Sequence, residues 1–250
     1  MAERRASLWE RFLNLVYPEP NGCLFCGAES PEDPDLWICP ECESQLLRHG
    51  PSVCRVCGRT TFGEAVCRAC VKHGLETKAK SIRILYQYQG LLRDTIHGVK
   101  FNGRRLGALA LAHLLAREVE KMEPKPERIL FVPSHVLRDF QRGYSVMGLT
   151  ARELSRLTGI PAEPRALKRV RYGRPMYKVA HEKRFEHIRG AYAKGRVSVS
   201  GKNCLLIDDI CTSGATLRTV LEALDDAEHV RVLIVSGPMD TGALEEKSDL

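Results

Sequence analysis

Four Cys-x-x-Cys pairs near the N-terminus constrain the fold of this chain more than any other feature of its sequence. They hold eight of the ten cysteines within one 48-residue stretch. The two-residue spacing lets both thiolates of a pair face one ion, and two pairs complete a tetrahedral site with Zn–S bonds of about 2.3 Å. Disulfides are the alternative, but the sequence shows no secretory signal, and cytosolic thiols stay reduced. We therefore predict two structural Zn²⁺ sites, formed by Cys23, Cys26, Cys39, Cys42, Cys54, Cys57, Cys67 and Cys70.

The order in which the pairs share their ions is open to two arrangements. In sequential ribbons the first two pairs hold one ion and the last two hold the other, whereas a cross-brace interleaves them. Loops of 12 and 9 residues separate the paired turns, lengths that suit independent ribbons, so we favour the sequential arrangement. Either arrangement fills all four positions of each ion, which is typical of structural rather than catalytic zinc.

After residue 80 the sequence alternates between apolar strands and helical patterns, which favours a parallel sheet covered by helices on both faces. We therefore expect two domains, residues 1–79 with an N-terminal helix and the zinc module, and residues 80–250 with the sheet. Cys204 opens one strand as a small core residue, and Cys211 lies inside the following loop, where its thiol could be exposed. The expected strands are 82–88, 128–133, 203–207 and 230–236, and the expected helices are 90–99, 106–122, 145–158 and 214–224.

Positive charge gathers in residues 165–196. This segment has eleven Lys and Arg against two Glu, a local charge of +9, whereas the whole chain carries +7. Such a density predicts an anionic partner, either a phosphate ligand or a nucleic acid, although a solvated face is the plainer alternative. The segment shows little helical periodicity, so we expect a mobile loop or an extended hairpin.

The most informative segment for function lies between two of the expected elements. The apolar strand 205–207 ends in Asp208 and Asp209, and a hydroxyl-rich turn then opens a helix. Unsatisfied backbone N–H groups at a helix N-terminus favour a phosphate, and paired carboxylates suit the vicinal hydroxyls of a ribose. A plain helix cap would explain one carboxylate but not two. The turn consists of Thr212, Ser213, Gly214, Ala215 and Thr216.

This segment resembles the loop with which type I phosphoribosyltransferases bind 5-phosphoribosyl 1-diphosphate (PRPP). In that loop Asp-Asp is followed by two residues and Thr-Thr-Gly-Ala-Thr, and here Ser213 keeps the hydroxyl of the second Thr. Other motifs resemble the ComF (ComFC) family, which is associated with natural competence, and the likeness covers nearly the whole chain. These motifs are the cysteine pairs and residues 12–18, 88–93, 96–101 and 142–144.

The resemblance implies a type I phosphoribosyltransferase-like sheet behind the zinc ribbons and a PRPP site that uses Mg²⁺. Asp208 and Asp209 would hold the ribose hydroxyls, the 212–216 turn would hold the 5-phosphate, and Mg²⁺ would bridge the diphosphate. Further residues would line a pyrophosphate loop, namely Ser134, His135, Arg138 and Arg142. A mobile basic loop would contribute Arg171, Arg174 and Lys178.

Two classes of function remain open at this point. One is a phosphoribosyltransferase that transfers or binds a phosphoribosyl group during DNA uptake. The other is a non-catalytic adaptor on the same fold that binds single-stranded DNA, with basic residues on phosphates and bases stacked on Tyr172, Tyr177 and Phe185. We expect competence or recombination proteins as partners. No run approaches the roughly 18 apolar residues of a membrane span, so we expect a cytoplasmic protein.

Overall fold

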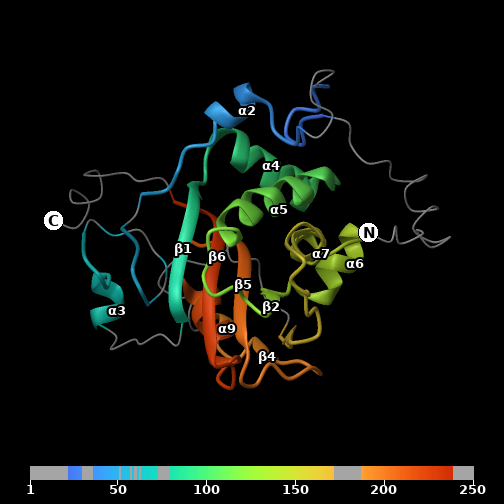
Figure 1. Ribbon diagram of the computed structural model, residues 1–250. Coiled ribbons are helices and arrows are strands. Elements are labelled where there is room, and N and C mark those ends of the chain that lie inside the picture. Colours follow the sequence, from blue (N-terminus) through green and yellow to red (C-terminus); the bar gives the residue numbers. More distant parts are fainter. Residues whose placement is uncertain are drawn as a thin grey trace.

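A four-stranded parallel sheet forms the centre of the molecule (Figure 1), in the order β1-β6-β5-β2. The computed structural model describes residues 22–29, 36–50, 52–56, 58, 61, 63–72, 79–171 and 187–238. The sheet confirms the predicted α/β class. Its strands are apolar along most of their length, as expected of strands covered on both faces. They are β1 (Ala79–Gln87), β2 (Arg128–Phe131), β5 (Asn203–Ile210) and β6 (His229–Gly237).

One face of the sheet is covered by three helices. Side chains of β5 alternate between the faces, and Leu205 and Ile207 point to this one, where they join the core with Leu111 and Leu115. The run of Leu and Ala that carries these last two residues forms a helix because it combines high helix propensity with an apolar side facing the sheet. The covering helices are α4 (Gly90–Phe101), α5 (Leu106–Val119) and α7 (Val146–Thr158).

The opposite face has its own core. Cys204 and Leu206 point to it and pack with Leu217 and Val220 of α9 (Ala215–Glu222). A two-stranded antiparallel ribbon adds to this side, made of β3 (Leu167–Arg169) and β4 (Tyr192–Lys194). The basic segment 165–196 therefore begins and ends in paired strands, as the hairpin alternative predicted, and its residues 172–186 lie outside the described residues.

The first zinc ribbon is built into the first of these cores. Cys23, Ile38 and Cys42 belong to the same buried cluster as α5. Trp37 stacks on His113 of that helix with ring centroids 4.8 Å apart, and the Arg117 guanidinium lies 4.5 Å from the Trp37 ring. The ribbon also carries α2 (Pro40–Ser44), which lies above α4 and α5 in Figure 1.

The second ribbon has a small core of its own, formed by Cys54, Val56, Cys67 and Cys70. It contains α3 (Arg68–Lys72), on the β1 side of the sheet in Figure 1. Its Gly58 adopts φ +74° and faces the second sheet core, where a Cβ would lie 2.8 Å from Ile82 Cγ2 and 3.7 Å from Cys211 Sγ. Both predicted domains are thus in contact, and a boundary near residue 79 stays a prediction.

One predicted loop is wrong. Residues 134–144, expected as a polar turn after β2, contain the helix α6 (Val136–Arg142). None of its residues is buried, and its seven residues are fewer than the window over which an apolar period indicates a helix. The other strands and helices expected after residue 80 are present within a few residues of their predicted ends, and the expected N-terminal helix lies outside the described residues. Within the described part of the chain, no helix has both the length and the apolar character that crossing a membrane requires.

Candidate functional site

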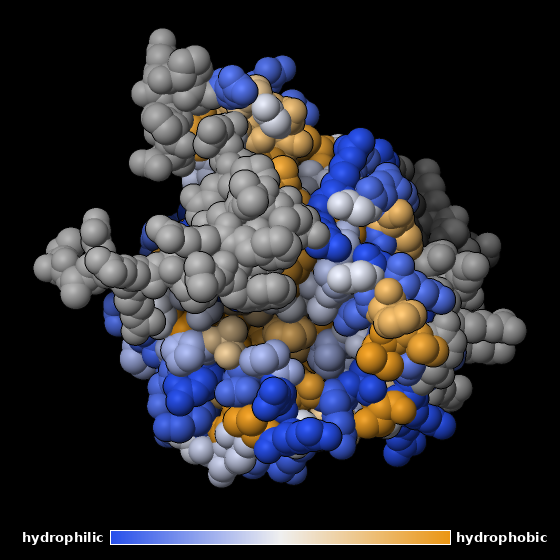
Figure 2. Space-filling model, turned by 90° about the vertical axis from the view of Figure 1, so that its right-hand side faces the viewer, coloured by the Kyte–Doolittle hydropathy of each residue, from blue (hydrophilic) through white to orange (hydrophobic). Residues whose placement is uncertain are grey.

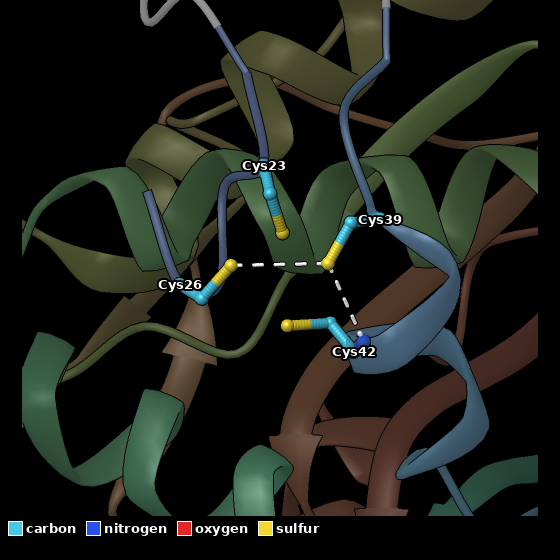
Figure 3. Close-up of side chains that lie close together, drawn as sticks. All are labelled: Cys23, Cys26, Cys39 and Cys42. Carbon is cyan, nitrogen blue, oxygen red and sulfur yellow. Dashed lines mark hydrogen bonds between the residues drawn. The ribbon is translucent and has the colours of Figure 1, made fainter. Parts of the chain in front are cut away.

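The first cysteine cluster has the geometry of a zinc site (Figure 3). The sulfur atoms of Cys23, Cys26, Cys39 and Cys42 all lie within 4.8 Å of one another. A Zn–S bond of about 2.3 Å requires tetrahedral edges of about 3.8 Å, and the Cys26 and Cys39 sulfurs are 3.8 Å apart. The grouping is sequential, as favoured from the loop lengths. The residues present therefore fit one Zn²⁺ ion.

The second cluster is also sequential as far as the structure describes it. Cys54 lies with Cys67 and Cys70, whereas Cys57 falls outside the described residues. The Cys67 N–H donates to Cys54 Sγ at 3.3 Å, and such bonds stabilise a sulfur that carries negative charge. Three buried thiols in one place fit a second Zn²⁺ ion, whose fourth ligand would be Cys57.

The paired carboxylates lie at the carboxyl end of β5. The strand continues through both residues to Ile210, with Asp208 opposite Ile234 of β6. The Asp209 N–H donates to Asp208 Oδ1 at 2.9 Å. Burial, followed by the neighbouring charge of Asp209, raises the pKa of Asp208 to about 8. Of the two carboxyl groups at this end of the strand, Asp208 therefore favours the protonated form near neutral pH.

Lys100, from the last turn of α4, contacts the second carboxylate. Its Nζ lies 2.7 Å from Asp209 Oδ2, and the two side chains are only 26% and 11% exposed. Sequence reasoning did not assign Lys100 to the site, because 109 positions separate the two residues and no local pattern joins them. The one available signal was its presence in the family-like motif 96–101.

The hydroxyl-rich turn follows the carboxylates after Ile210 and Cys211. Gly214 stands at the start of α9 with φ +71°, a conformation that favours glycine. The Cys211 N–H donates to the Ser236 carbonyl at 3.0 Å, and the Ser236 hydroxyl donates to the Asp209 carbonyl at 3.1 Å. β6 thus fixes the entry to the turn. Cys211 is 5% exposed, so its thiol is buried.

The four residues of the predicted pyrophosphate loop lie on or beside α6. Residues that follow β2 lie beside those that follow Ile207 of β5, because the Val132 N–H donates to the Ile207 carbonyl at 3.1 Å. Within this segment several groups already have protein partners. The Ser134 hydroxyl donates to Asp139, and His135 Nδ1 accepts from the backbone N–H of Leu137 at 3.2 Å as the helix cap.

Arg142 faces α4, and the charge of Arg138 acts on His135 and on Tyr192 of β4. Arg142 Nε donates to the Lys100 carbonyl at 2.8 Å. Burial, and then the nearby charges of Arg169 and Arg138, lower the pKa of His135. The structure therefore brings the cations of three separate segments toward one edge of the sheet.

The ribbon of β3 and β4 closes this edge. The Arg169 guanidinium lies 5.5 Å from the Tyr192 ring centroid. Burial raises the pKa of Tyr192 to about 12, with Asp208 and Asp209 contributing in the same direction. These two residues were not assigned to the site from the sequence. Arg171 donates to the Arg189 carbonyl at 2.9 Å, and the other predicted residues of the basic loop, Arg174 and Lys178, lie outside the described residues.

Comparison with protein families gives two matches along the chain. The model of the double zinc ribbon domain matches residues 12–71, and that of the phosphoribosyl transferase domain matches residues 141–247. The chain in a solved structure of the glutamine PRPP amidotransferase from Bacillus subtilis is 26% identical to this one. The matched region covers 51% of this chain and 25% of the amidotransferase chain. Its TM-score of 0.35 is too low to carry weight.

Relatives match over much more of the chain. Competence protein ComFC of Bacillus subtilis is 26% identical over 219 residues, which are 81% of this chain and 88% of that protein. DNA utilization protein YhgH of Escherichia coli and competence protein F of Haemophilus influenzae are each 26% identical, over 75% of this chain and 83% of theirs. With a double zinc ribbon ahead of a type I phosphoribosyltransferase-like domain, this chain is similar over most of its length to the competence proteins ComFC and F and to the DNA utilization protein YhgH.

Proposed function

We propose that this protein binds PRPP with Mg²⁺ at the carboxyl end of β5 and that it acts in the uptake or use of DNA. One observation carries the proposal. Two carboxyl groups lie near the carboxyl end of a buried parallel strand, shortly before a hydroxyl-rich turn that opens a helix, and ligands of open α/β sheets bind at such strand ends. The relatives named for competence and DNA utilization support the biological setting. We place the protein in the cytoplasm, where thiols stay reduced and free to bind zinc.

The turn 212–216 would bind the 5-phosphate. Backbone N–H groups in the first turn of α9 have no helical partner and carry a partial positive charge. The hydroxyls of Thr212, Ser213 and Thr216 add donors, and these three residues keep some exposure to solvent. Gly214 leaves the backbone open to close approach. A phosphate monoester needs this combination of donors, whereas a carboxylate-lined strand end alone would repel it.

The carboxyl groups of Asp208 and Asp209 would face the ribose. Vicinal hydroxyls donate hydrogen bonds, and ionised carboxylates accept them strongly, at roughly 1.5–3 kcal/mol each. Because the pKa of Asp208 is raised to about 8, we expect ribose binding to strengthen as the pH rises toward that value. A bare phosphate gains nothing from these carboxylates, so the site would discriminate ribose phosphates from inorganic phosphate.

Cations around α6 and β3 would receive the diphosphate. Arg138 lies on α6 near His135, and Arg169 lies across from it on β3. Mg²⁺ prefers oxygen ligands and retains several of them from its substrate. Asp209 is already paired with Lys100, so Mg²⁺ would be held chiefly by the diphosphate. It would neutralise the charge that develops as the diphosphate departs.

If the protein turns over, pyrophosphate leaves C1 of the ribose with the bonding electrons, and an acceptor atom forms the new bond to C1. The residues named above would contribute by positioning the ligand and by placing charge around it. Calorimetric titration with PRPP and Mg²⁺ tests whether the ligand binds, and a pyrophosphate-release assay on the same protein tests whether it is turned over. Ribose 5-phosphate should compete with PRPP and inorganic phosphate should compete only weakly. A protein that shows no heat of binding would refute the proposal.

A second candidate function is binding of single-stranded DNA. Figure 2 looks onto the side that carries α6 and α7 in Figure 1, and it shows hydrophobic side chains dispersed among hydrophilic ones. Phe140 on α6 is 85% exposed and Phe101 at the end of α4 is 58% exposed. Each belongs to a helix that also carries cations, Arg138 and Lys100 among them. Exposed aromatic rings near cations are the elements of a stacking surface for unpaired bases.

A further inference from the structure

The ion pair between Lys100 and Asp209 joins two elements that the sequence leaves far apart. The Nζ–Oδ2 distance is 2.7 Å, and both side chains are mostly buried. Among the described residues, Lys100 is the cation that forms an ion pair with a carboxyl group at this strand end. A buried lysine of this kind rarely survives without a partner, because the protein interior disfavours a bare charge.

The backbone that carries Lys100 is held in place by the segment after α6. Arg142 Nε donates to the carbonyl of Lys100 at 2.8 Å, and the Tyr144 hydroxyl donates to the carbonyl of Val99 at 2.5 Å. Tyr144 is 9% exposed and packs with Val99, and the Arg105 guanidinium lies 4.8 Å from its ring. The Arg-Gly-Tyr motif at 142–144 therefore fixes the last turn of α4, and with it the position of the Lys100 ammonium group.

The positive charge of Lys100 reduces the electrostatic repulsion within the site. Two adjacent carboxyl groups repel each other and would together repel a ligand that carries a phosphate and a diphosphate. The charges of Asp209 and Lys100 act on Asp208, and both carboxyl groups act on Tyr192, which the charges of Arg169 and Arg138 also influence. Of these groups, Lys100 contacts a carboxylate oxygen directly. The Lys100 side chain keeps 26% of its surface exposed.

We infer that Lys100 is a positioning and affinity-determining residue of the phosphoribosyl site proposed above: it orients Asp209 for the ribose and offsets the negative charge of that carboxylate. The inference rests on that proposed function. It assigns the motif 142–144 an indirect role, because these residues hold the helix end that presents Lys100. It also gives a reason for the burial of this lysine at a strand end that binds anions.

The test compares Lys100→Met with the wild-type zinc-loaded protein by calorimetric titration of PRPP and Mg²⁺ from pH 6.5 to 9. Loss of a charge-assisted contact should weaken binding by about tenfold or more. Lys100 lowers the pKa of Asp208, so its removal should also move the pH at which binding is half-maximal upward. Lys121→Met is the matched control, since it removes one positive charge from an ion pair with Glu118 on α5.

Two further variants separate a role through Asp209 from a general loss of stability. Lys100→Met/Asp209→Asn should bind PRPP no more weakly than Asp209→Asn alone, because the lysine acts through that carboxylate. Lys100→Gln replaces the Met variant if the latter melts at a lower temperature than wild type. Unchanged affinity in Lys100→Met, or weaker binding with an unchanged pH midpoint, would overturn the inference while leaving the proposed function in place. A wild-type protein that binds no PRPP would instead refute the proposed function, and the inference with it.

Discussion

Replacing Asp208 by Asn should stabilise the protein at alkaline pH while it weakens PRPP binding. Asn has the same shape, and its amide oxygen can still accept the N–H of Asp209, now bonded at 2.9 Å. The substitution removes the Asp208 carboxyl group. Burial and the charge of Asp209 raise the pKa of this group to about 8. The folded protein holds this proton more tightly than the unfolded chain, so the free energy of unfolding falls as the pH rises from the ordinary value of 3.8 to about 8.

The size of the effect follows from that interval. Each pH unit in which the unfolded chain has lost a proton that the folded chain retains lowers the free energy of unfolding by about 1.4 kcal/mol. The interval from the ordinary pKa of 3.8 to the raised pKa of about 8 sets an upper limit of about 6 kcal/mol on the loss of unfolding free energy. Asp208 is only partly buried and water screens part of this cost, so we expect about 2–3 kcal/mol at pH 8.5. For a chain of this length that corresponds to a rise in Tm of about 4–12 °C.

Urea unfolding of the wild type, Asp208→Asn and Asp209→Asn at several pH values from 6 to 9 measures the effect. The stability of Asp208→Asn relative to wild type should grow with pH and level off above pH 8. Asp209→Asn should be less stable than wild type throughout, because it leaves Lys100 without its carboxylate. Both variants should bind PRPP about tenfold more weakly or worse. A difference between Asp208→Asn and wild type that does not change with pH would refute the reasoning.

Two further predictions concern the zinc ribbons and the basic ribbon. Metal analysis of protein purified without chelator should give about two Zn²⁺ per chain, and Cys23→Ser or Cys54→Ser should lower metal content and solubility together; a single zinc at full occupancy would contradict two four-cysteine sites. If residues 165–196 bind DNA phosphates, affinity for single strands should fall steeply with salt, and the joint neutralisation of Arg169, Arg171 and Arg174 should flatten that dependence. An unchanged dependence in this triple variant would exclude the segment from the DNA-binding surface.

The sheet could be predicted from the sequence because its strands carry their own signal. The run from Cys204 to Ile207 is apolar without interruption, as a strand buried on both faces requires. The turn 212–216 could be predicted for the same reason, since a pair of carboxylates before a hydroxyl-rich helix start is a local sequence pattern. The same holds for the cysteine pairs, whose spacing is set by the geometry of one metal ion.

Features that depend on contacts between distant segments could not be predicted. The pairing of Lys100 with Asp209 depends on where the end of α4 lies against β5, which no local pattern specifies. α6 was not predicted because its seven residues are fewer than the window over which an apolar period indicates a helix. Cys211 could have been exposed because its loop is polar, but Gly58 of the second ribbon approaches its sulfur from outside the sheet.

The contact between Trp37 and α5 has a consequence for how such proteins diverge. Trp37 stacks on His113 and lies under Arg117, and Arg117 also binds Glu43 of α2 through Nη2 at 3.0 Å. A ribbon exchanged between relatives would therefore bring an ill-fitting surface to this helix. We expect the residues at positions 37, 43, 113 and 117 to vary together among relatives, so that the ribbon and the helix are inherited as one unit.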